Sequence, residues 1–178
     1  YDPHIWFDVT LWREAVKKVN NELAKLVPDA KDAFQKNTDA YVAKLDELHA
    51  YVKAQIGSIP KESRVLVTAH DAFGYFGEQY DMEVKSVQGT STATEAGAKD
   101  VQDLARVIAD RKIKAVFVES SVPKETVEAV QKAVKSRGWD VVIGGQLYSD
   151  AMGNDGTPEG TYVGMVRANV DIIVKALK

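Results

Sequence analysis

The fold class is decided by the stretch RVLVTAHD at residues 64–71, where a short apolar run ends on polar side chains. A run of this length, rich in β-branched residues, is typical of a buried strand. We predict a strand over residues 64–69, a short helix over 72–80 and a second strand over 83–87. A strand, a helix and another strand form the unit from which parallel sheets are built.

The same alternation of strand and helix continues to the end of the chain. After a helix that ends near residue 112, the pattern predicts strands over 115–119 and 140–143 and helices over 124–137 and 161–177. Parallel strands joined in this way need right-handed crossovers, with helices on both faces of the sheet. We therefore predict an α/β fold in which a four-stranded parallel sheet is flanked by helices.

Local signals mark two boundaries in this region. The helix that ends near residue 112 has two candidate capping boxes at its start, Thr92 with Glu95 or Gly97 with Asp100, and both stay open. After the last predicted strand, the glycines at 144–145 predict a loop in which the backbone turns sharply.

Two long helices are predicted before residue 64. In the first, Asp8 is the expected N-cap and Pro28 ends the helix. The second is expected to take Asp29 as N-cap and to run to about Ile56, roughly 27 residues or about 40 Å, which is long enough to connect two bodies. The apolar residues at helical spacing are Trp12, Val16, Val19, Leu23 and Leu26 in the first helix and Phe34, Tyr41, Leu45, Leu48 and Val52 in the second.

The amino-acid composition excludes several classes of function. The chain has 178 residues, of which 45% are hydrophobic, so it can bury a sizeable core. Its formal net charge of -3 gives no electrostatic reason to expect a nucleic-acid partner. The absence of cysteine excludes disulfides, thiolate metal sites and cysteine nucleophiles. The longest apolar runs are far shorter than the ~20 residues of a membrane-spanning helix.

Polar side chains follow the predicted strands at their carboxyl ends, where open parallel sheets bind ligands. His70 and Asp71 follow the first strand, Glu119 closes the third, and Asp150 lies a few residues beyond the fourth. A further histidine, His4, lies in a stiff, aromatic-rich stretch before the first helix, a setting that orients an imidazole. Two imidazoles and a carboxylate suit Zn²⁺ well and Mn²⁺ acceptably.

Each candidate also has an ordinary structural role, and spacing alone leaves the choice open. A histidine after a strand is often only hydrogen-bonded, Asp150 could cap a turn, and Glu119 could pair with a lysine. Asp71 is expected to be the N-cap of the short helix that follows it. His49 lies in the middle of a helix and is interpreted as a boundary or solvated residue.

The same region of the sequence also allows an enzymatic alternative. Ser120 or Ser121 could form a hydrolytic triad with His70 and Asp150. The sequence lacks the G-x-S-x-G turn that exposes such a serine, and it contains no phosphate-binding loop, dinucleotide fingerprint or H-E-x-x-H motif. These absences argue against an enzyme.

Three motifs carry a resemblance to a known family. The chain contains DPHIW at residues 2–6, VTAHDAFGYF at 67–76 and GGQLYSDAMG at 144–153, followed by GTY at 160–162. In this order and at these separations they resemble the solute-binding proteins of zinc- and manganese-type ABC importers, the metal-binding lipoproteins of the cell adhesion family. The resemblance covers the whole chain.

The resemblance implies two lobes joined by one long helix, with the metal in the cleft between them. Residues 1–28 would be the end of the N-terminal lobe, 29–60 the linker helix and 61–178 the C-terminal α/β lobe. Because the chain opens at Tyr1 without an initiator methionine, we expect a piece of a longer protein that lacks most of the N-terminal lobe. That missing lobe would be a partner of this chain.

The resemblance also implies the ligand set. His4, His70 and Asp150 would be three of four protein ligands, and the fourth would lie in the missing lobe. Asp71 and Glu119 are candidates for orienting the imidazoles. Manganese-favouring members tend to carry glutamate where this chain has His70, and an imidazole nitrogen moves the site toward Zn²⁺. Zinc is therefore favoured and manganese remains possible.

The function implied is capture of a divalent transition metal and its delivery to an ABC permease, without catalysis. Such a protein would lie in the periplasm or at the outer face of the bacterial cytoplasmic membrane, and would touch the membrane only through a lipid anchor outside this chain. Two alternatives stay open: a metal-dependent hydrolase that uses an open zinc site, and an interaction module without metal.

Overall fold

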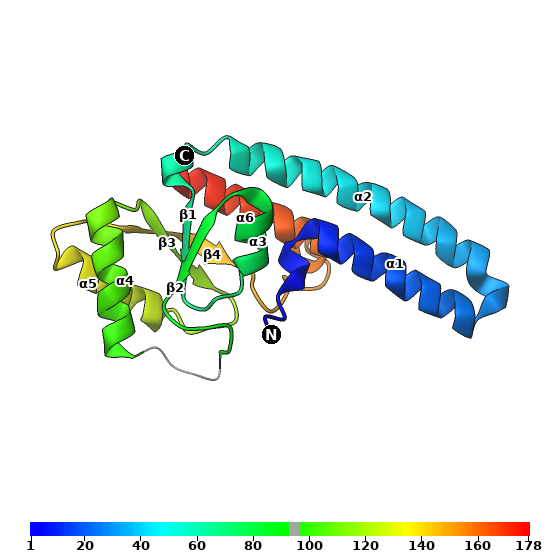
Figure 1. Cartoon of the computed structure of the whole chain (residues 1–178), viewed down its shortest axis with the longest axis horizontal. Coiled ribbons are helices and arrows are strands. Elements are labelled where there is room, and N and C mark those ends of the chain that lie inside the picture. Colours follow the sequence, from blue (N-terminus) through cyan, green and yellow to red (C-terminus); the bar gives the residue numbers. More distant parts are fainter. Residues whose placement is uncertain (93–96) are drawn as a thin grey trace.

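The computed structural model describes residues 1–92 and 97–178 and consists of an α/β body from which a helical hairpin extends (Figure 1). The hairpin is formed by two long helices, and the body contains four strands and four helices among the described residues. In chain order the elements are α1 (Val9–Leu26), α2 (Lys31–Gly57), β1 (Val65–Thr68), α3 (Gly74–Tyr80), β2 (Glu83–Ser86), α4 (Ala98–Arg111), β3 (Ala115–Glu119), α5 (Glu125–Lys135), β4 (Val142–Leu147) and α6 (Tyr162–Leu177).

The strands are parallel, as predicted, but they form two ladders rather than one continuous sheet. β1 pairs with β2, and β3 pairs with β4. β1 and β3 are the inner strands of the two pairs and lie next to each other. At the end of β1, the carboxylate of Glu119 accepts the backbone N–H groups of Ala69 and His70. A side chain from β3 thus takes donors that a continuous ladder would pair with backbone carbonyls. The α/β class is confirmed, and the single four-stranded sheet is corrected to two parallel pairs.

Alternation along the strands divides the apolar residues between two cores. On β1, Leu66 faces a core shared with α2, α3 and α6, whereas Val65 and Val67 face α4 and α5. On β3, Phe117 and Val116 divide in the same way. The period of two in a strand therefore places helices on both faces of the strands, as expected.

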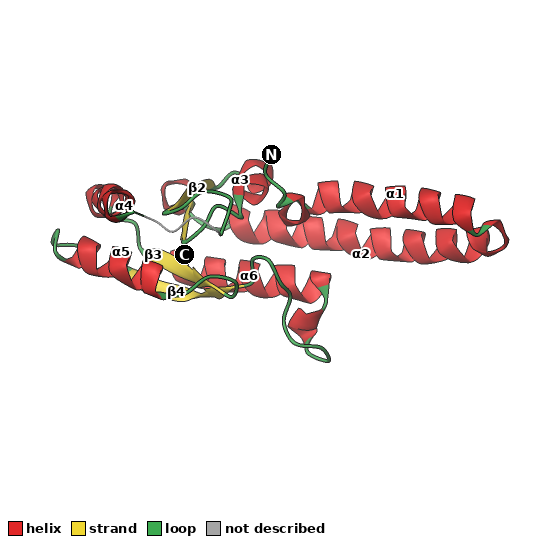
Figure 2. Cartoon of the chain, turned by 90° about the horizontal axis from the view of Figure 1, so that it is seen from below, coloured by secondary structure: helices red, strands yellow, loops and turns green. Residues whose placement is uncertain are grey.

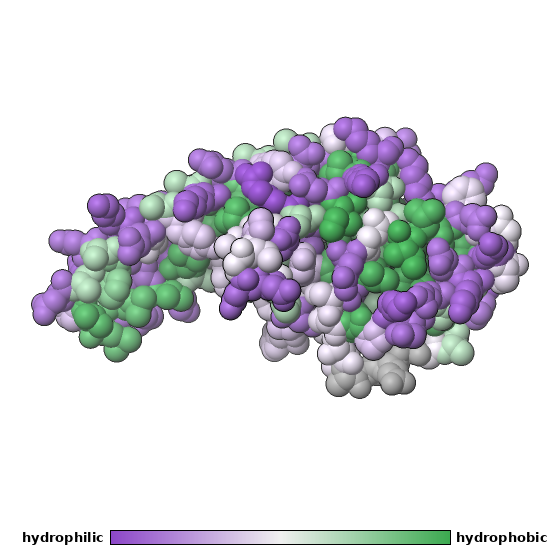
Figure 3. Space-filling model, turned by 180° about the vertical axis from the view of Figure 1, so that it is seen from behind, coloured by the Kyte–Doolittle hydropathy of each residue, from purple (hydrophilic) through white to green (hydrophobic). Residues whose placement is uncertain are grey.

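The hairpin is anchored at one end only. The C-terminal half of α2 buries Leu45, Leu48 and Val52 against the body, whereas Val19 and Leu26 of α1 are 58% and 76% exposed. Figure 2 shows the hairpin projecting from the body, and the space-filling view in Figure 3 shows apolar residues gathered at its tip. Within the described parts of the chain, none of the helices combines the length and the apolar character that crossing a bilayer requires.

In the hairpin, one predicted helix cap is confirmed and the other is wrong. Asp8 is the N-cap of α1, because its carboxylate accepts the N–H groups of Thr10 and Leu11. Asp29 was wrongly predicted as the N-cap of α2. It lies within a 3₁₀ turn, Pro28–Ala30, so the α-helix begins one residue later than predicted, with Ala30 as its N-cap. The helix nevertheless has the predicted length of 27 residues.

Boundaries in the body also differ from the prediction. Asp71 was wrongly predicted as the N-cap of the short helix, since α3 begins at Gly74 with Phe73 as its N-cap. α4 begins after Gly97, whose N–H donates to the carboxylate of Asp100. The other candidate box, at Thr92, depends on a residue at position 95 that lies outside the described residues.

The strand β4 continues through the two glycines that were predicted to open a loop. A Cβ at Gly144 would lie 2.7 Å from the ring of Phe117 and from Ala176, and one at Gly145 would lie 2.6 Å from Ile172. These glycines therefore allow β4 to approach β3 and α6 closely instead of turning the chain. As a result the strand reaches Leu147, and the segment after it emerges beside the end of β3.

Replacing Asp8 with alanine is expected to destabilise the protein by about 1 to 2 kcal/mol, because two N–H groups of α1 lose their acceptor. Asp8→Asn keeps a side-chain oxygen at the same place and is expected to lose less than half of that. The measurement is the free energy of unfolding from urea denaturation of the three proteins. Equal losses in both variants would contradict the capping role.

Candidate metal centre

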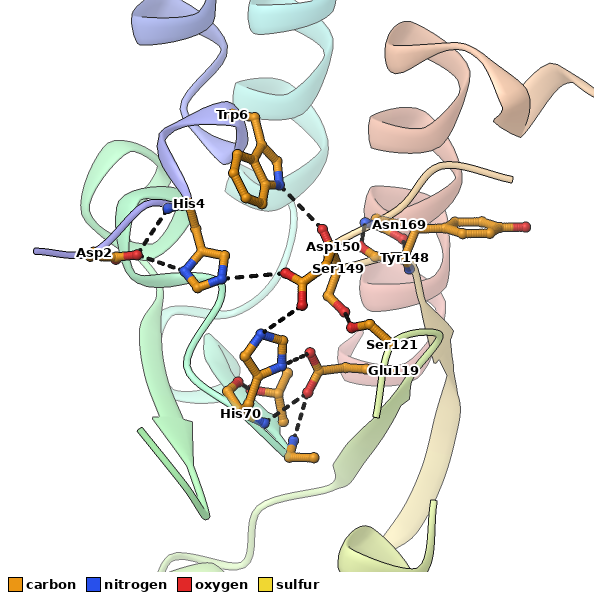
Figure 4. A network of polar contacts seen from close by, with 12 residues as sticks. Asp2, His4, Trp6, His70, Glu119, Ser121, Tyr148, Ser149, Asp150 and Asn169 are labelled. Atoms are coloured by element: carbon orange, nitrogen blue, oxygen red, sulfur yellow. Dashed lines mark hydrogen bonds and ion pairs between the residues drawn. The ribbon is translucent and has the colours of Figure 1, made fainter. Parts of the chain in front are cut away.

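Three side chains from distant parts of the chain converge beside the strand ends (Figure 4). His4 precedes α1, His70 follows β1 and Asp150 follows β4. The Nε2 atom of His4 lies 3.3 Å from Oδ1 of Asp150, and Nε2 of His70 lies 3.6 Å from Oδ2 of Asp150. One donor atom from each residue can be chosen so that all three lie within 4.8 Å of one another. The structure thus brings together the three predicted ligands.

The spacing and burial of these atoms fit a small divalent cation. A tetrahedral ion about 2.1 Å from each ligand holds its ligand atoms roughly 3.4 Å apart, close to the two observed distances. Nε2 of His70 is buried and makes no hydrogen bond within the part of the chain that the structure describes. A buried polar atom without a partner is unfavourable unless something binds it. His4 is 3% exposed and His70 is fully buried, while Asp150 keeps the cluster accessible from one side.

The imidazole of His4 is held by a residue two positions before it. Oδ1 of Asp2 accepts the backbone N–H of His4 at 3.0 Å and lies 2.6 Å from Nδ1 of its ring. The ring of Trp6 packs against the same imidazole edge-on, with 5.1 Å between the ring centroids. Asp2 was not predicted as a partner of His4. The sequence signal for this contact is an aspartate two residues before the histidine, with Pro3 between them.

The imidazole of His70 is held by Glu119. Oε2 of Glu119 lies 2.5 Å from Nδ1 of the ring, and Oε1 accepts the N–H groups of Ala69 and His70, each at 2.9 Å. Burial alone would lower the pKa of His70, but the carboxylates of Glu119 and Asp150 outweigh it and hold this pKa above its ordinary value. Glu119 is therefore in direct contact with a candidate ligand, as predicted from its position at the strand end.

The other two residues considered, Asp71 and His49, make no hydrogen bond or ion pair with His4 or His70 in the described chain. In the described chain, no hydrogen bond or ion pair joins the carboxylate of Asp71 to His4 or His70, so the structure offers no contact for its predicted orienting role. Burial, followed by the negative charge of Asp2, raises the pKa of Asp71. His49 is part-buried on α2, where Nδ1 lies 3.2 Å from the hydroxyl of Tyr80, consistent with a boundary residue.

The segment that carries Asp150 is fixed by residues that the sequence analysis missed. Asn169 of α6 accepts the N–H of Tyr148 at 2.9 Å and donates to its carbonyl at 2.8 Å. Trp6 donates its indole N–H to the carbonyl of Ser149 at 3.2 Å. A polar residue among the apolar positions of the last helix was the signal for Asn169. The Trp6 contact joins positions 143 residues apart and left no local signal.

The same network links the His4 stretch to the last helix. The hydroxyl of Tyr162 donates to the carbonyl of Trp6 at 2.6 Å. Burial raises the pKa of Tyr162, so the phenol stays protonated and remains a donor. Trp6 is therefore hydrogen-bonded both to Ser149, next to Asp150, and to Tyr162 of α6, so one network joins the segments that carry the two candidate ligands.

The considered serine triad is not assembled. The hydroxyl of Ser121 pairs with that of Ser149 rather than with an imidazole. Both ring nitrogens of His70 face carboxylates, Glu119 on one side and Asp150 on the other. The arrangement is one of converging ligand atoms and not of a nucleophile activated by a base.

Fold and site together correspond to a class of metal-binding uptake proteins. Residues 1–176 match the family described as ZnuA, zinc-uptake complex component A periplasmic. The chain belongs to this family, which confirms the resemblance seen in the three motifs.

Relatives in this family agree in fold and differ in the ion they are named for. The zinc-binding protein TroA of Treponema pallidum is 56% identical over 177 residues, which are 99% of this chain and 58% of that protein. The manganese-binding lipoprotein MntA of Bacillus subtilis is 50% identical over 178 residues, again 58% of that protein. The structure of the periplasmic zinc-binding protein TroA from Treponema pallidum superimposes with a TM-score of 0.97, covering 99% of this chain and 64% of that one.

A second TroA structure gives the same result at lower identity, with 42% identical residues and a TM-score of 0.95 over 99% of this chain. The chain spans about 58% of the length of the curated relatives it matches. None of the names given above describes a hydrolase.

Proposed function

We propose that this chain supplies three ligands, His4, His70 and Asp150, to a site for one divalent transition-metal ion. The observation that carries the proposal is the buried Nε2 atom of His70, which has no hydrogen-bond partner in the described chain and faces Asp150 beside His4. In the whole protein the site would capture the ion outside the cytoplasmic membrane for delivery to an ABC permease. This role is binding without catalysis.

Zinc is the favoured ion, with manganese as the second candidate. Two imidazole nitrogens and a carboxylate oxygen are donors that bind Zn²⁺ more strongly than Mn²⁺ in the usual order of stabilities. The names of relatives support both ions, since TroA is described as zinc-binding and MntA as manganese-binding. Because three ligands leave one position of a tetrahedral ion free, a further ligand from a longer chain would complete the site.

The proposed organisation follows the same family pattern. Residues 1–28 would belong to one lobe, 29–60 to a linker and 61–178 to the second lobe. The unbroken 27-residue α2, buried along one half and exposed along the other, supports the linker role. Extracytoplasmic location, with attachment through a lipid anchor, is supported by the descriptions of relatives as periplasmic proteins or lipoproteins.

Titration of the purified, metal-free protein with Zn²⁺ is expected to give saturable binding of one ion per chain, and with Mn²⁺ weaker binding at the same stoichiometry. The measurement is isothermal titration calorimetry, with elemental analysis after removal of unbound metal. A chain that retains no metal after exposure to zinc would contradict the proposal. Turnover of ester or phosphoester substrates that depends on zinc and His70 would instead favour a hydrolase.

A further inference from the structure

Two carboxylates hold the two imidazoles, but they use their oxygens differently. Asp2 uses one oxygen, Oδ1, both for the backbone N–H of His4 and for Nδ1 of its ring. Glu119 divides its oxygens: Oε1 accepts two backbone N–H groups, and Oε2 faces Nδ1 of His70. When each carboxylate is replaced by the corresponding amide, this difference decides which oxygen position the NH₂ group takes.

The position of the proton on His70 follows from the Glu119 contact. Nδ1 and Oε2 lie 2.5 Å apart, and because a carboxylate oxygen carries no proton of its own, so close a contact is favourable only with the proton on Nδ1. In the neutral imidazole, Nε2 is then unprotonated and has a free lone pair. This lone pair belongs to the buried atom that faces Asp150.

The carboxylate cannot easily rotate away from this role. Glu119 is 2% exposed, and its Oε1 is held by the N–H groups of Ala69 and His70. The hydroxyl of Thr68 donates to the carbonyl of His70 at 2.8 Å, so the backbone of the same residue is held from both directions. The ring of His70 therefore has one supported orientation.

We propose that Glu119 is a positioning residue that sets the tautomer of His70 and so presents its Nε2 atom to the metal. The inference rests on the metal-binding function proposed above and deepens it. In this role Glu119 keeps Nε2 of His70 unprotonated. A residue that only linked β1 to β3 would have no effect on the position of that proton.

Glu119→Gln separates these two roles. The two backbone N–H groups are donors and need an acceptor opposite them, so the amide oxygen must take the place of Oε1 and the NH₂ group must face Nδ1. Nδ1 then becomes the acceptor, and the proton moves to Nε2, where it blocks coordination. The link between the strands is retained while the tautomer is reversed.

Asp2→Asn is the matched comparison. Its amide oxygen can replace Oδ1 and still accept from both the backbone N–H and the ring of His4. The tautomer of His4 is preserved, and only the negative charge is lost. We expect zinc affinity to fall about 10- to 100-fold in Glu119→Gln, and no more than about five-fold in Asp2→Asn.

The experiment combines zinc calorimetry of the two variants with ¹⁵N NMR of the ring nitrogens in metal-free protein. The chain has three histidines, so His70 can be assigned with single substitutions of the other two. For the neutral imidazole of His70, the expected signature is a proton on Nδ1 in the native protein and on Nε2 in Glu119→Gln. His49→Gln serves as the variant that leaves both readouts unchanged.

Several outcomes would overturn the inference without touching the proposed function. One is a neutral His70 imidazole that carries its proton on Nε2 in the native, metal-free protein, which can be observed even if Glu119→Gln does not fold. Another is a folded Glu119→Gln that binds zinc as tightly as the native chain. If instead the native chain binds no metal, the proposed function fails, and the NMR experiment still tests the tautomer.

Discussion

Replacing His70 with alanine is expected to weaken zinc binding by at least about a hundred-fold. Loss of a group that merely orients a ligand already weakens metal binding by about 10- to 100-fold, so loss of the ligand itself exceeds that range. His70 is fully buried, and its Nε2 atom, which has no hydrogen-bond partner in the described chain, faces the carboxylate of Asp150. The measurement is zinc affinity by competition with a chromogenic chelator.

His49→Ala is the matched control for this prediction. It removes the same side chain from a part-buried position on α2, where the ring contacts Tyr80 and not the cluster. Circular dichroism checks that both variants are folded, and we expect His70→Ala to remain folded because Glu119 keeps its two N–H donors. Equal zinc affinity in His70→Ala and the native chain would exclude His70 as a ligand.

Gly164→Ala is expected to destabilise the protein by about 3 kcal/mol, which lowers the melting temperature by roughly 6 to 12 °C. A Cβ at this position would lie 1.8 Å from the carbonyl oxygen of Pro158, a backbone atom that cannot move away alone. The start of α6 and the loop before it must separate. Since the segment between β4 and α6 carries Asp150, zinc affinity is expected to fall as well.

The control for this prediction is Gly57→Ala at the end of α2. No atom lies within 4 Å of a Cβ built there, so the added methyl group meets open space. Alanine also restricts the unfolded chain, and we expect a gain of about 0.4 to 1 kcal/mol. Calorimetric melting of both variants checks the pair. A Gly164→Ala protein as stable as the native chain would show that the loop and α6 are not packed as described.

The sequence predicts the fold well where the signal is local. The strand at residues 64–69 and the cap at Asp8 depend on neighbouring residues, and the structure contains both, with β1 two residues shorter. The end of β4 was misplaced because glycines usually open loops, whereas here Gly144 and Gly145 are required by contacts with β3 and α6. Contacts between distant elements decide such cases, and a single sequence does not reveal them.

For the site, too, local sequence patterns were predictive and contacts between distant residues were not. His4, His70 and Asp150 were identified because each follows a recognisable pattern, and the structure brings them together. Asn169 and Trp6 were missed, since their partners lie 21 and 143 residues away. For Asp71, no hydrogen bond or ion pair to either imidazole is found in the described chain, and its orienting role stays a prediction.

The pairing of the strands has a mechanical consequence. His70 follows β1 of one pair and Asp150 follows β4 of the other, so the two residues lie on opposite sides of a seam. Across the described part of this seam no backbone ladder resists shear, and Glu119 supplies the polar link. A cation coordinated from both sides would add bonds across it, so loading with metal would stiffen the body as a whole.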